Sequence, residues 1–228
     1  MAVPLLVFDV NETLLDLEAL APHFERMFGE GRVLREWFAQ VILYSEAITL
    51  CDDYVPFGEL GGAVLRMLAR TRGVQIHETD LQDLKEAVAT MPSHPEVHGA
   101  LVRLREAGFR LYTLTNNPKA TCVRQLEEAG ISSLFEGQFS VDDTAHRYKP
   151  AREVYQEVEV SLGVSPADLC LIACHTWDIL GAAAAGWKTA FIARSGNAPL
   201  AVGAQPLIQG PDLDVVAQEL ILRFAAQN

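Results

Sequence analysis

The sequence predicts an α/β fold in which a parallel sheet is covered by helices and a helical cap domain is inserted after the first strand. Three observations support this prediction. A short apolar run occupies residues 3–8, a purely helical pattern follows over residues 17–90, and strands and helices then alternate. Such alternation is typical of a parallel sheet, because helices connect its neighbouring strands.

The first strand is expected at residues 3–8. The run is continuously apolar, as in a central strand with both faces covered. It ends at Asp9, so this carboxylate is expected at the carboxyl end of the strand. The run is too short to span a membrane and lacks the basic flank of a signal peptide.

Helical periodicity then continues without a strand pattern as far as residue 90. The apolar spacing predicts helices at residues 18–28, 33–48, 57–72 and 81–90. Connections between successive strand–helix units are normally short, so an all-helical stretch of this length indicates an inserted domain. We therefore expect residues 1–16 and 91–228 to form the α/β core, and residues 17–90 to form a cap that closes over Asp9.

The alternating part of the chain follows Pro92. Its strands are expected at residues 109–114, near residue 139, at 169–173 and at 189–192. Its helices are expected at residues 96–107, 119–129, 151–162, 179–185 and 214–226. Gly108 and Gly130 are expected to end the first two of these helices.

Polar side chains follow three of the predicted strands. They are Asp9, Thr115 with Asn116, and His175 with Asp178. In open parallel sheets, ligands bind beyond the carboxyl ends of the strands. These side chains therefore predict a single active site at that edge of the sheet.

The composition excludes several classes of protein. The chain has a formal net charge of -12 and no dense run of lysine or arginine, which argues against a nucleic-acid binder. Half of its 228 residues are hydrophobic, which is ample for a folded core. Its four cysteines show no zinc-site spacing, and a chain this large and core-rich does not need a disulfide framework, so we expect free thiols and a reducing cytoplasm. No membrane partner is expected.

The candidate nucleophile, Asp9, lies in the segment FDVNETLLD at residues 8–16. A carboxylate fixed at a strand end can attack carbon or phosphorus to form an ester or acyl phosphate, which water then hydrolyses. A lone aspartate after a strand is more often a helix cap or turn residue. Three later segments favour chemistry: LTNNP at 114–118, YKP at 148–150 and ACHTWDILGA at 173–182.

In this order, the four segments resemble the four motifs of the haloacid dehalogenase superfamily, whose core is a Rossmann-like parallel sheet with a cap. The resemblance implies that Asp9 is the nucleophile and that Lys149 neutralises charge around it. It also implies that Thr13, Thr115 and Asn116 bind substrate, with helix N-terminal N–H groups helping to hold an anion.

Two positions separate this chain from the metal-dependent phosphatases of the superfamily. Those enzymes usually carry an acid four residues before Asp178, where this chain has Cys174, a poor ligand for magnesium. They also place a general-acid aspartate two residues after the nucleophile, where this chain has Asn11. Both differences favour the L-2-haloacid dehalogenase branch, which implies no metal and no cofactor.

In that branch the nucleophile displaces halide from the α-carbon, and Asp178 helps to orient or activate the water that hydrolyses the ester. Serine and asparagine commonly precede that aspartate, in places held here by Ala173 and His175. His175 is therefore a candidate for water activation, because the pKa of histidine is near neutral. A purely structural histidine is the alternative.

Aromatic side chains complete the expected pocket. Tyr155 and Trp177 match the family pattern and are expected to wall the pocket and hold Lys149, although core packing would explain both. The cap of the family supplies an anion-binding arginine just after a tryptophan, where this chain has Phe38, with Arg35 one helical turn earlier. The resemblance therefore implies a weakened or rearranged anion site.

The leading hypothesis is a metal-independent hydrolase that dehalogenates a short 2-haloalkanoate, a small anionic substrate, through an ester on Asp9. The resemblance also implies a homodimer. Two alternatives remain open at this stage. One is a phosphatase with an atypical magnesium site, and the other is a catalytically degraded member of the superfamily.

Overall fold

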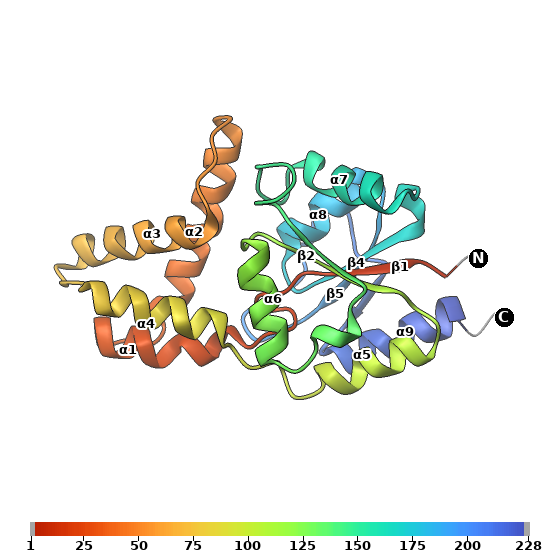
Figure 1. The fold of residues 1–228 in the computed structure, drawn as a ribbon, viewed down its shortest axis with the longest axis horizontal. Helices are drawn as coiled ribbons and strands as arrows, with labels where there is room; N and C mark the ends of the chain where they lie inside the picture. The colour runs from red at the N-terminus through yellow and green to blue at the C-terminus, as the bar shows by residue number, and fades with distance from the viewer. Residues whose placement is uncertain (1–2, 226–228) are drawn as a thin grey trace.

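The computed structural model describes residues 3–225, and its centre is a six-stranded parallel sheet (Figure 1). The order across the sheet is β3-β2-β1-β4-β5-β6. The strands are β1 (Leu5–Phe8), β2 (Leu111–Thr115), β3 (Gly137–Ser140), β4 (Leu169–Ala173), β5 (Lys188–Ile192) and β6 (Ile208–Gly210). The predicted α/β fold with a parallel sheet is confirmed.

Strand β1 lies in the middle of this sheet, between β2 and β4. Its residues Leu6, Val7 and Phe8 are fully buried, which explains the continuous apolar run. The chain moves from β1 to β2 and β3 on one side, and to β4, β5 and β6 on the other. The carboxyl end of β1 therefore lies where the strand order reverses, which is where open α/β sheets bind ligands.

Helices cover both faces of the sheet (Figure 1). Helix α5 (Val97–Glu106) packs against α9 (Leu213–Leu220) on one face, and α7 (Arg152–Leu162) packs against α8 (Thr176–Ala185) on the other. Helix α6 (Lys119–Glu128) packs against β3. The short helices of this part are η2 (Ser132–Leu134), η3 (Pro166–Asp168) and the π-helical turn η4 (Ile221–Ala225).

The helices between β1 and α5 form a group to one side of the sheet (Figure 1). They are η1 (Leu17–Leu20), α1 (Ala21–Phe28), α2 (Val33–Leu50), α3 (Phe57–Arg72) and α4 (Glu78–Ala89). We call this set the helical group. Trp37 joins two of its helices, because its Nε1 donates to the carbonyl of Gly61 over 2.9 Å. The exact domain boundaries at residues 16/17 and 90/91 stay a prediction.

Several local predictions differ from the structure, and among them α4 begins at Glu78 rather than at residue 81. The first predicted helix is divided into η1 and α1, since Pro22 has no N–H to continue the preceding turn. Strand β6 was not predicted, because three residues are too few to show a pattern. Helix α8 begins at Thr176 rather than at residue 179, so Asp178 lies in a helical first turn instead of a loop.

The C-terminal prediction ended at residue 226, which lies outside the described residues. Within residues 3–225, every helix is too short or too polar to cross a lipid bilayer.

Candidate active site

The Asp9 carboxylate lies at the carboxyl end of β1, where only 5% of the residue is exposed. Its Oδ1 accepts a hydrogen bond from Lys149 Nζ at 2.9 Å. Its Oδ2 accepts one from Thr13 Oγ1 at 2.6 Å and lies 3.0 Å from His175 Nδ1. Both oxygens are therefore fixed by polar partners, each from a different segment of the chain.

Lys149 connects the Oδ1 side to a second carboxylate. Its ammonium is fully buried and donates to Asp9 Oδ1, to Asp178 Oδ2 at 2.6 Å and to the carbonyl of Leu114 at 3.0 Å. The remaining oxygen of Asp178 accepts from the hydroxyl of Tyr155 at 2.6 Å. All three ammonium protons and both Asp178 oxygens thus have partners inside the protein.

His175 connects the Oδ2 side to a third carboxylate, that of Glu12. His175 Nε2 lies 2.8 Å from Glu12 Oε2. The other oxygen of Glu12 accepts from Asn197 Nδ2 at 2.8 Å and from the guanidinium of Arg35. Arg35 belongs to α2 and also binds Glu18, so the helical group touches this side of the site.

Glu12 is a site residue that sequence reasoning missed. It is 3% exposed and has a φ of 65°, in the left-handed region that residues other than glycine seldom adopt. This backbone turn directs its carboxylate toward His175. The only signal in the sequence was an additional acid three residues after Asp9, inside the first motif.

The charges set the protonation states of these groups. Burial alone would raise the pKa of Asp9, but Lys149 and His175 outweigh it and hold the pKa well below its usual value. Burial likewise opposes ionisation of Glu12, whose pKa is lowered by His175 and Arg35. Both carboxylates are therefore ionised at neutral pH.

His175 has the opposite shift. Burial lowers its pKa, but contacts with Cys174, Asp9 and Glu12 raise the pKa well above its usual value. In this state the imidazole is protonated, and each ring N–H donates to one carboxylate. Burial also lowers the pKa of Lys149, but Asp178 and Asp9 raise it above its usual value. The nucleophile therefore faces two cations.

A narrow pocket lies beside Asp9, between the sheet and the helical group. Its lining comprises Asp9, Asn11, Phe38, Ile42, Phe57, Thr115, Asn116, His175 and Trp177. Phe38 and Ile42 come from α2 and Phe57 from α3, so the helical group supplies apolar walls. The combination of a carboxylate and apolar walls suits a small substrate that carries an electrophilic carbon.

The predicted wall residues surround His175. The ring of Trp177 stacks on the His175 ring with centroids 4.9 Å apart, and the ring of Phe38 lies 5.6 Å away. Trp177 also lies 5.5 Å from Lys149 Nζ. Tyr155 is fully buried and bonds to Asp178, and it does not line the pocket as predicted.

Thr115 and Asn116, which were predicted to bind an anion, also line the pocket. Thr115 Oγ1 accepts from the backbone N–H of Asn117 at 3.1 Å. Asn116 Oδ1 accepts a hydrogen bond from the backbone N–H of Lys149 at 3.1 Å. The Nδ2 group of Asn116 is therefore the one that can donate to a ligand. Arg35 is instead bound by Glu12 and Glu18 and is absent from the pocket lining.

The donor set does not fit a magnesium ion. Asp9, Cys174 and His175 place ligand atoms within 4.8 Å of one another. However, burial raises the pKa of the Cys174 thiol, and a neutral thiol is a poor partner for Mg²⁺. The oxygens of Asp9 and Asp178 are already bound by cations and hydroxyl groups.

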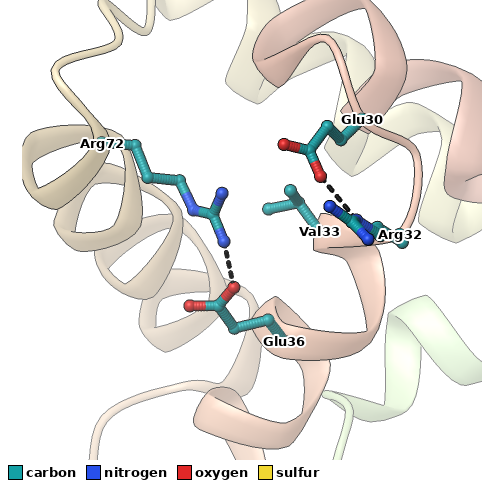
Figure 2. A pocket seen from close by; sticks show the side chains of 5 residues that line it. All are labelled: Glu30, Arg32, Val33, Glu36 and Arg72. Atoms are coloured by element: carbon teal, nitrogen blue, oxygen red, sulfur yellow. Dashed lines mark hydrogen bonds and ion pairs between the residues drawn. The ribbon is translucent and has the colours of Figure 1, made fainter.

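A second pocket lies on the surface of the helical group (Figure 2). It is lined by Glu30, Arg32, Val33, Glu36 and Arg72. Figure 2 shows that its charges pair with each other, Arg32 with Glu30 at 2.5 Å and Arg72 with Glu36. It contains none of the residues bonded to Asp9, so we assign the chemistry to the first pocket.

Comparisons with known proteins agree with this geometry. The family model of the haloacid dehalogenase-like hydrolases matches residues 3–186. The chain is 28% identical to haloacetate dehalogenase H-2 of Moraxella sp. (strain B), over 92% of this chain and 95% of that protein. It is 31% identical to (S)-2-haloacid dehalogenase 1 of Pseudomonas sp. (strain CBS-3), over 82% and 83% of the two chains.

Among solved structures, that of the L-2-haloacid dehalogenase RSc1362 matches with a TM-score of 0.91 and 28% identity, and the match covers 96% of this chain and 99% of that one. The similarity thus includes the sheet, the motif segments and the inserted helices. The chain belongs to the haloacid dehalogenase-like hydrolases.

Proposed function

We propose that this protein hydrolytically removes the halogen from a short 2-haloalkanoate, through an ester on Asp9 and without a metal ion. The observation that carries the proposal is an ionised, buried carboxylate, held by Lys149 at the edge of a pocket that has both polar and apolar walls. Relatives over most of the chain are named for dehalogenation of haloacetate and of (S)-2-haloacids.

In the first step, a carboxylate oxygen of Asp9 attacks the α-carbon of the substrate. The new C–O bond forms as the carbon–halogen bond breaks, and the halide leaves with the bonding electrons. A halide needs no proton to leave. This agrees with Asn11, whose Oδ1 is occupied as an acceptor for Gln125 Nε2 at 3.1 Å and is not poised for acid catalysis.

We assign the substrate carboxylate to the wall formed by Thr115 and Asn116, and its carbon chain to the apolar walls at Phe38 and Trp177. Thr13 holds Asp9 Oδ2 directly, so its role in the proposal is to orient the nucleophile rather than to touch the substrate. Tyr155 acts through Asp178, because its hydroxyl bonds that carboxylate.

In the second step, water attacks Cγ of the Asp9 ester. The product 2-hydroxyalkanoate departs with an oxygen that belonged to Asp9, and the aspartate keeps an oxygen from water. This exchange distinguishes an ester mechanism from direct attack of water on the substrate. The phosphatase alternative is not favoured, because the curated relatives are dehalogenases.

The expected cytoplasmic location and homodimer also belong to this proposal. The location is supported by four free cysteines, of which Cys122, Cys170 and Cys174 are buried. The dimer is supported by apolar side chains exposed on α2, among them Leu43 and Leu50. Light scattering of the purified chain would test the dimer.

The activity is tested with a panel of chloro-, bromo- and fluoroacetate, both 2-chloropropionate enantiomers and an aryl phosphate, each with and without EDTA. We expect halide release that persists in EDTA and labelling of Asp9 by H₂¹⁸O during turnover. Asp9→Asn should abolish the release, whereas Asp143→Asn, an exposed aspartate, should not. Magnesium-dependent phosphate release without halide release would contradict the proposal.

A further inference from the structure

The His175 imidazole bridges two buried carboxylates, with Nδ1 3.0 Å from Asp9 Oδ2 and Nε2 2.8 Å from Glu12 Oε2. We propose that His175 is the base that activates water in ester hydrolysis, and that Glu12 is the positioning residue that holds it. The inference rests on the proposed function and replaces Asp178 as the expected water-activating group.

Asp178 is poorly placed to act as that base. Both of its oxygens have strong partners, Lys149 Nζ at 2.6 Å and the Tyr155 hydroxyl at 2.6 Å. The residue is fully buried and is absent from the lining of the pocket. A water in the pocket would therefore have to enter the buried region behind Lys149 and Tyr155 to reach it.

His175, in contrast, lies on the pocket and touches the nucleophile. A water approaching Cγ of Asp9 from the His175 side passes within reach of Nδ1. The ring cannot easily turn away, because it is stacked on Trp177 and its other nitrogen is held by Glu12. Geometry therefore favours His175 as the base.

Ester formation supplies the change in protonation that the base needs. Before reaction, the ring donates to two carboxylates and is protonated. When Asp9 becomes an uncharged ester, one of these anions disappears, and the Nδ1 proton is released to solvent. Glu12 keeps the Nε2–H in place, so that the lone pair of Nδ1 faces the ester.

The atoms and charges then balance. Water forms a bond to Cγ and gives one proton to His175 Nδ1. The second water proton leaves on the product hydroxyl as the bond between Cγ and the alkoxy oxygen breaks. Asp9 is again a carboxylate and His175 is again protonated. The proton released earlier to solvent is the one that the overall hydrolysis of a haloacid produces.

The surroundings of His175 support this assignment. The charged and titratable groups facing it are Asp9, Glu12 and Cys174. Its aromatic neighbours are Phe38 from α2 and Trp177 from α8. Glu12 is held in turn by Asn197 and Arg35, and its left-handed backbone, with φ at 65°, is uncommon outside glycine. These contacts fix the carboxylate in the position that orients the imidazole.

The test is a rapid-quench single-turnover experiment with a haloacid that the wild type hydrolyses. His175→Gln and Glu12→Gln should release one halide per site and then accumulate the ester on the Asp9 peptide, detected by mass spectrometry. We expect ester breakdown to slow by about 10²–10⁴-fold in His175→Gln, the usual contribution of a general base. Glu36→Gln is the matched control, because Glu36 lies on α2 and pairs with Arg72 rather than with Arg35, Glu12 or His175.

The pH dependence separates positioning from a merely structural role. Wild-type ester breakdown should rise with pH through one ionisation, which His175→Gln should lack. Glu12→Gln should move the midpoint to lower pH, because it removes an anion that stabilises protonated His175. Circular dichroism checks the folding of both variants.

If both variants slow halide release and ester breakdown equally, with no ester accumulating, the inference is wrong while the function of Asp9 stands. If wild type releases no halide from any haloacid, the proposed function itself fails, and the inference fails with it.

Discussion

The two oxygens of Asp9 face two differently constructed sides of the site. On the Oδ1 side, Lys149 is fully buried, and it is enclosed by Asp9, Asp178 and the Leu114 carbonyl. On the Oδ2 side, a chain of contacts runs through His175 and Glu12 to Arg35, whose side chain is 34% exposed. We call these the lysine side and the histidine side.

The difference lies in what each side can change during reaction. The lysine side consists of one cation whose donors are all used, so it supplies a constant positive charge. The histidine side contains a ring that can lose a proton when Asp9 loses its charge, and it borders the pocket. We infer that the lysine side serves ester formation and the histidine side serves ester hydrolysis.

The largest effect is expected from Lys149→Met, which removes the cation of the lysine side at similar volume. Asp178 would then be buried without a counter-charge, and Asp9 would keep only His175 as a cationic partner. Breaking a buried pair in this way costs about 3–5 kcal/mol of unfolding free energy. Urea unfolding measures this loss, and halide release should fall to background.

Lys85→Met is the control for the change of side chain, since Lys85 is exposed on α4. If Lys149→Met lowered the unfolding free energy by less than about 1 kcal/mol, the size typical of exposed pairs, Lys149 would not supply the balancing charge of the lysine side.

Asp178→Asn should reduce halide release by about tenfold to a hundredfold, the range for losing a charged hydrogen bond. Without Asp178, the Lys149 ammonium binds Asp9 alone and makes it a weaker nucleophile. Because the histidine side is intact, no ester should accumulate in single-turnover experiments. If the ester did accumulate in this variant, Asp178 rather than His175 would be the group that activates water, and the two sides would not have separate roles.

The lysine side was easier to predict from the sequence than the histidine side. Asp9, Lys149 and Asp178 each occur in a motif segment, and the order of these segments is itself informative. A parallel sheet brings the ends of β1 and β4 together, so local patterns were enough to predict their proximity. The structure brings these three side chains into contact, and their catalytic roles stay predictions.

Glu12 shows why the remainder could not be predicted. Its position follows from a left-handed backbone turn, and its partners are His175, Arg35 and Asn197, which lie 23 to 185 residues away. No local pattern records such contacts. Strand β6 was missed for a related reason: its three residues depend on pairing with β5 rather than on a periodicity of their own.

The stability of the protein should depend on pH through His175. The pKa of this residue is raised in the folded protein. Its contribution to the unfolding free energy is therefore complete below the pKa of the unfolded chain, about 6.5, and is lost as the pH rises through the pKa of the folded protein. Between these values the unfolding free energy should fall by up to about 1.4 kcal/mol per pH unit. Urea unfolding between pH 6 and pH 9 tests this, and His175→Gln should remove that slope.

The smallest effect is expected from Arg35→Gln, at the outer end of the histidine side. The Arg35 side chain is about one-third exposed, so we expect its ion pair with Glu12 to contribute no more than about 1 kcal/mol of stability. Its effect on ester breakdown should nevertheless have a definite sign. Loss of a cation beside Glu12 favours protonated His175, so the midpoint of the pH profile should move to higher pH.

That shift is opposite to the one expected for Glu12→Gln, although both variants break the same ion pair. A structural disturbance common to both changes would move the two midpoints in the same direction. Arg32→Gln is the control, because Arg32 also lies on the helical group, and its salt bridge is with Glu30. Opposite shifts of the midpoint in Arg35→Gln and Glu12→Gln would therefore show that these residues act on His175 through their charge. Shifts in the same direction would contradict that role.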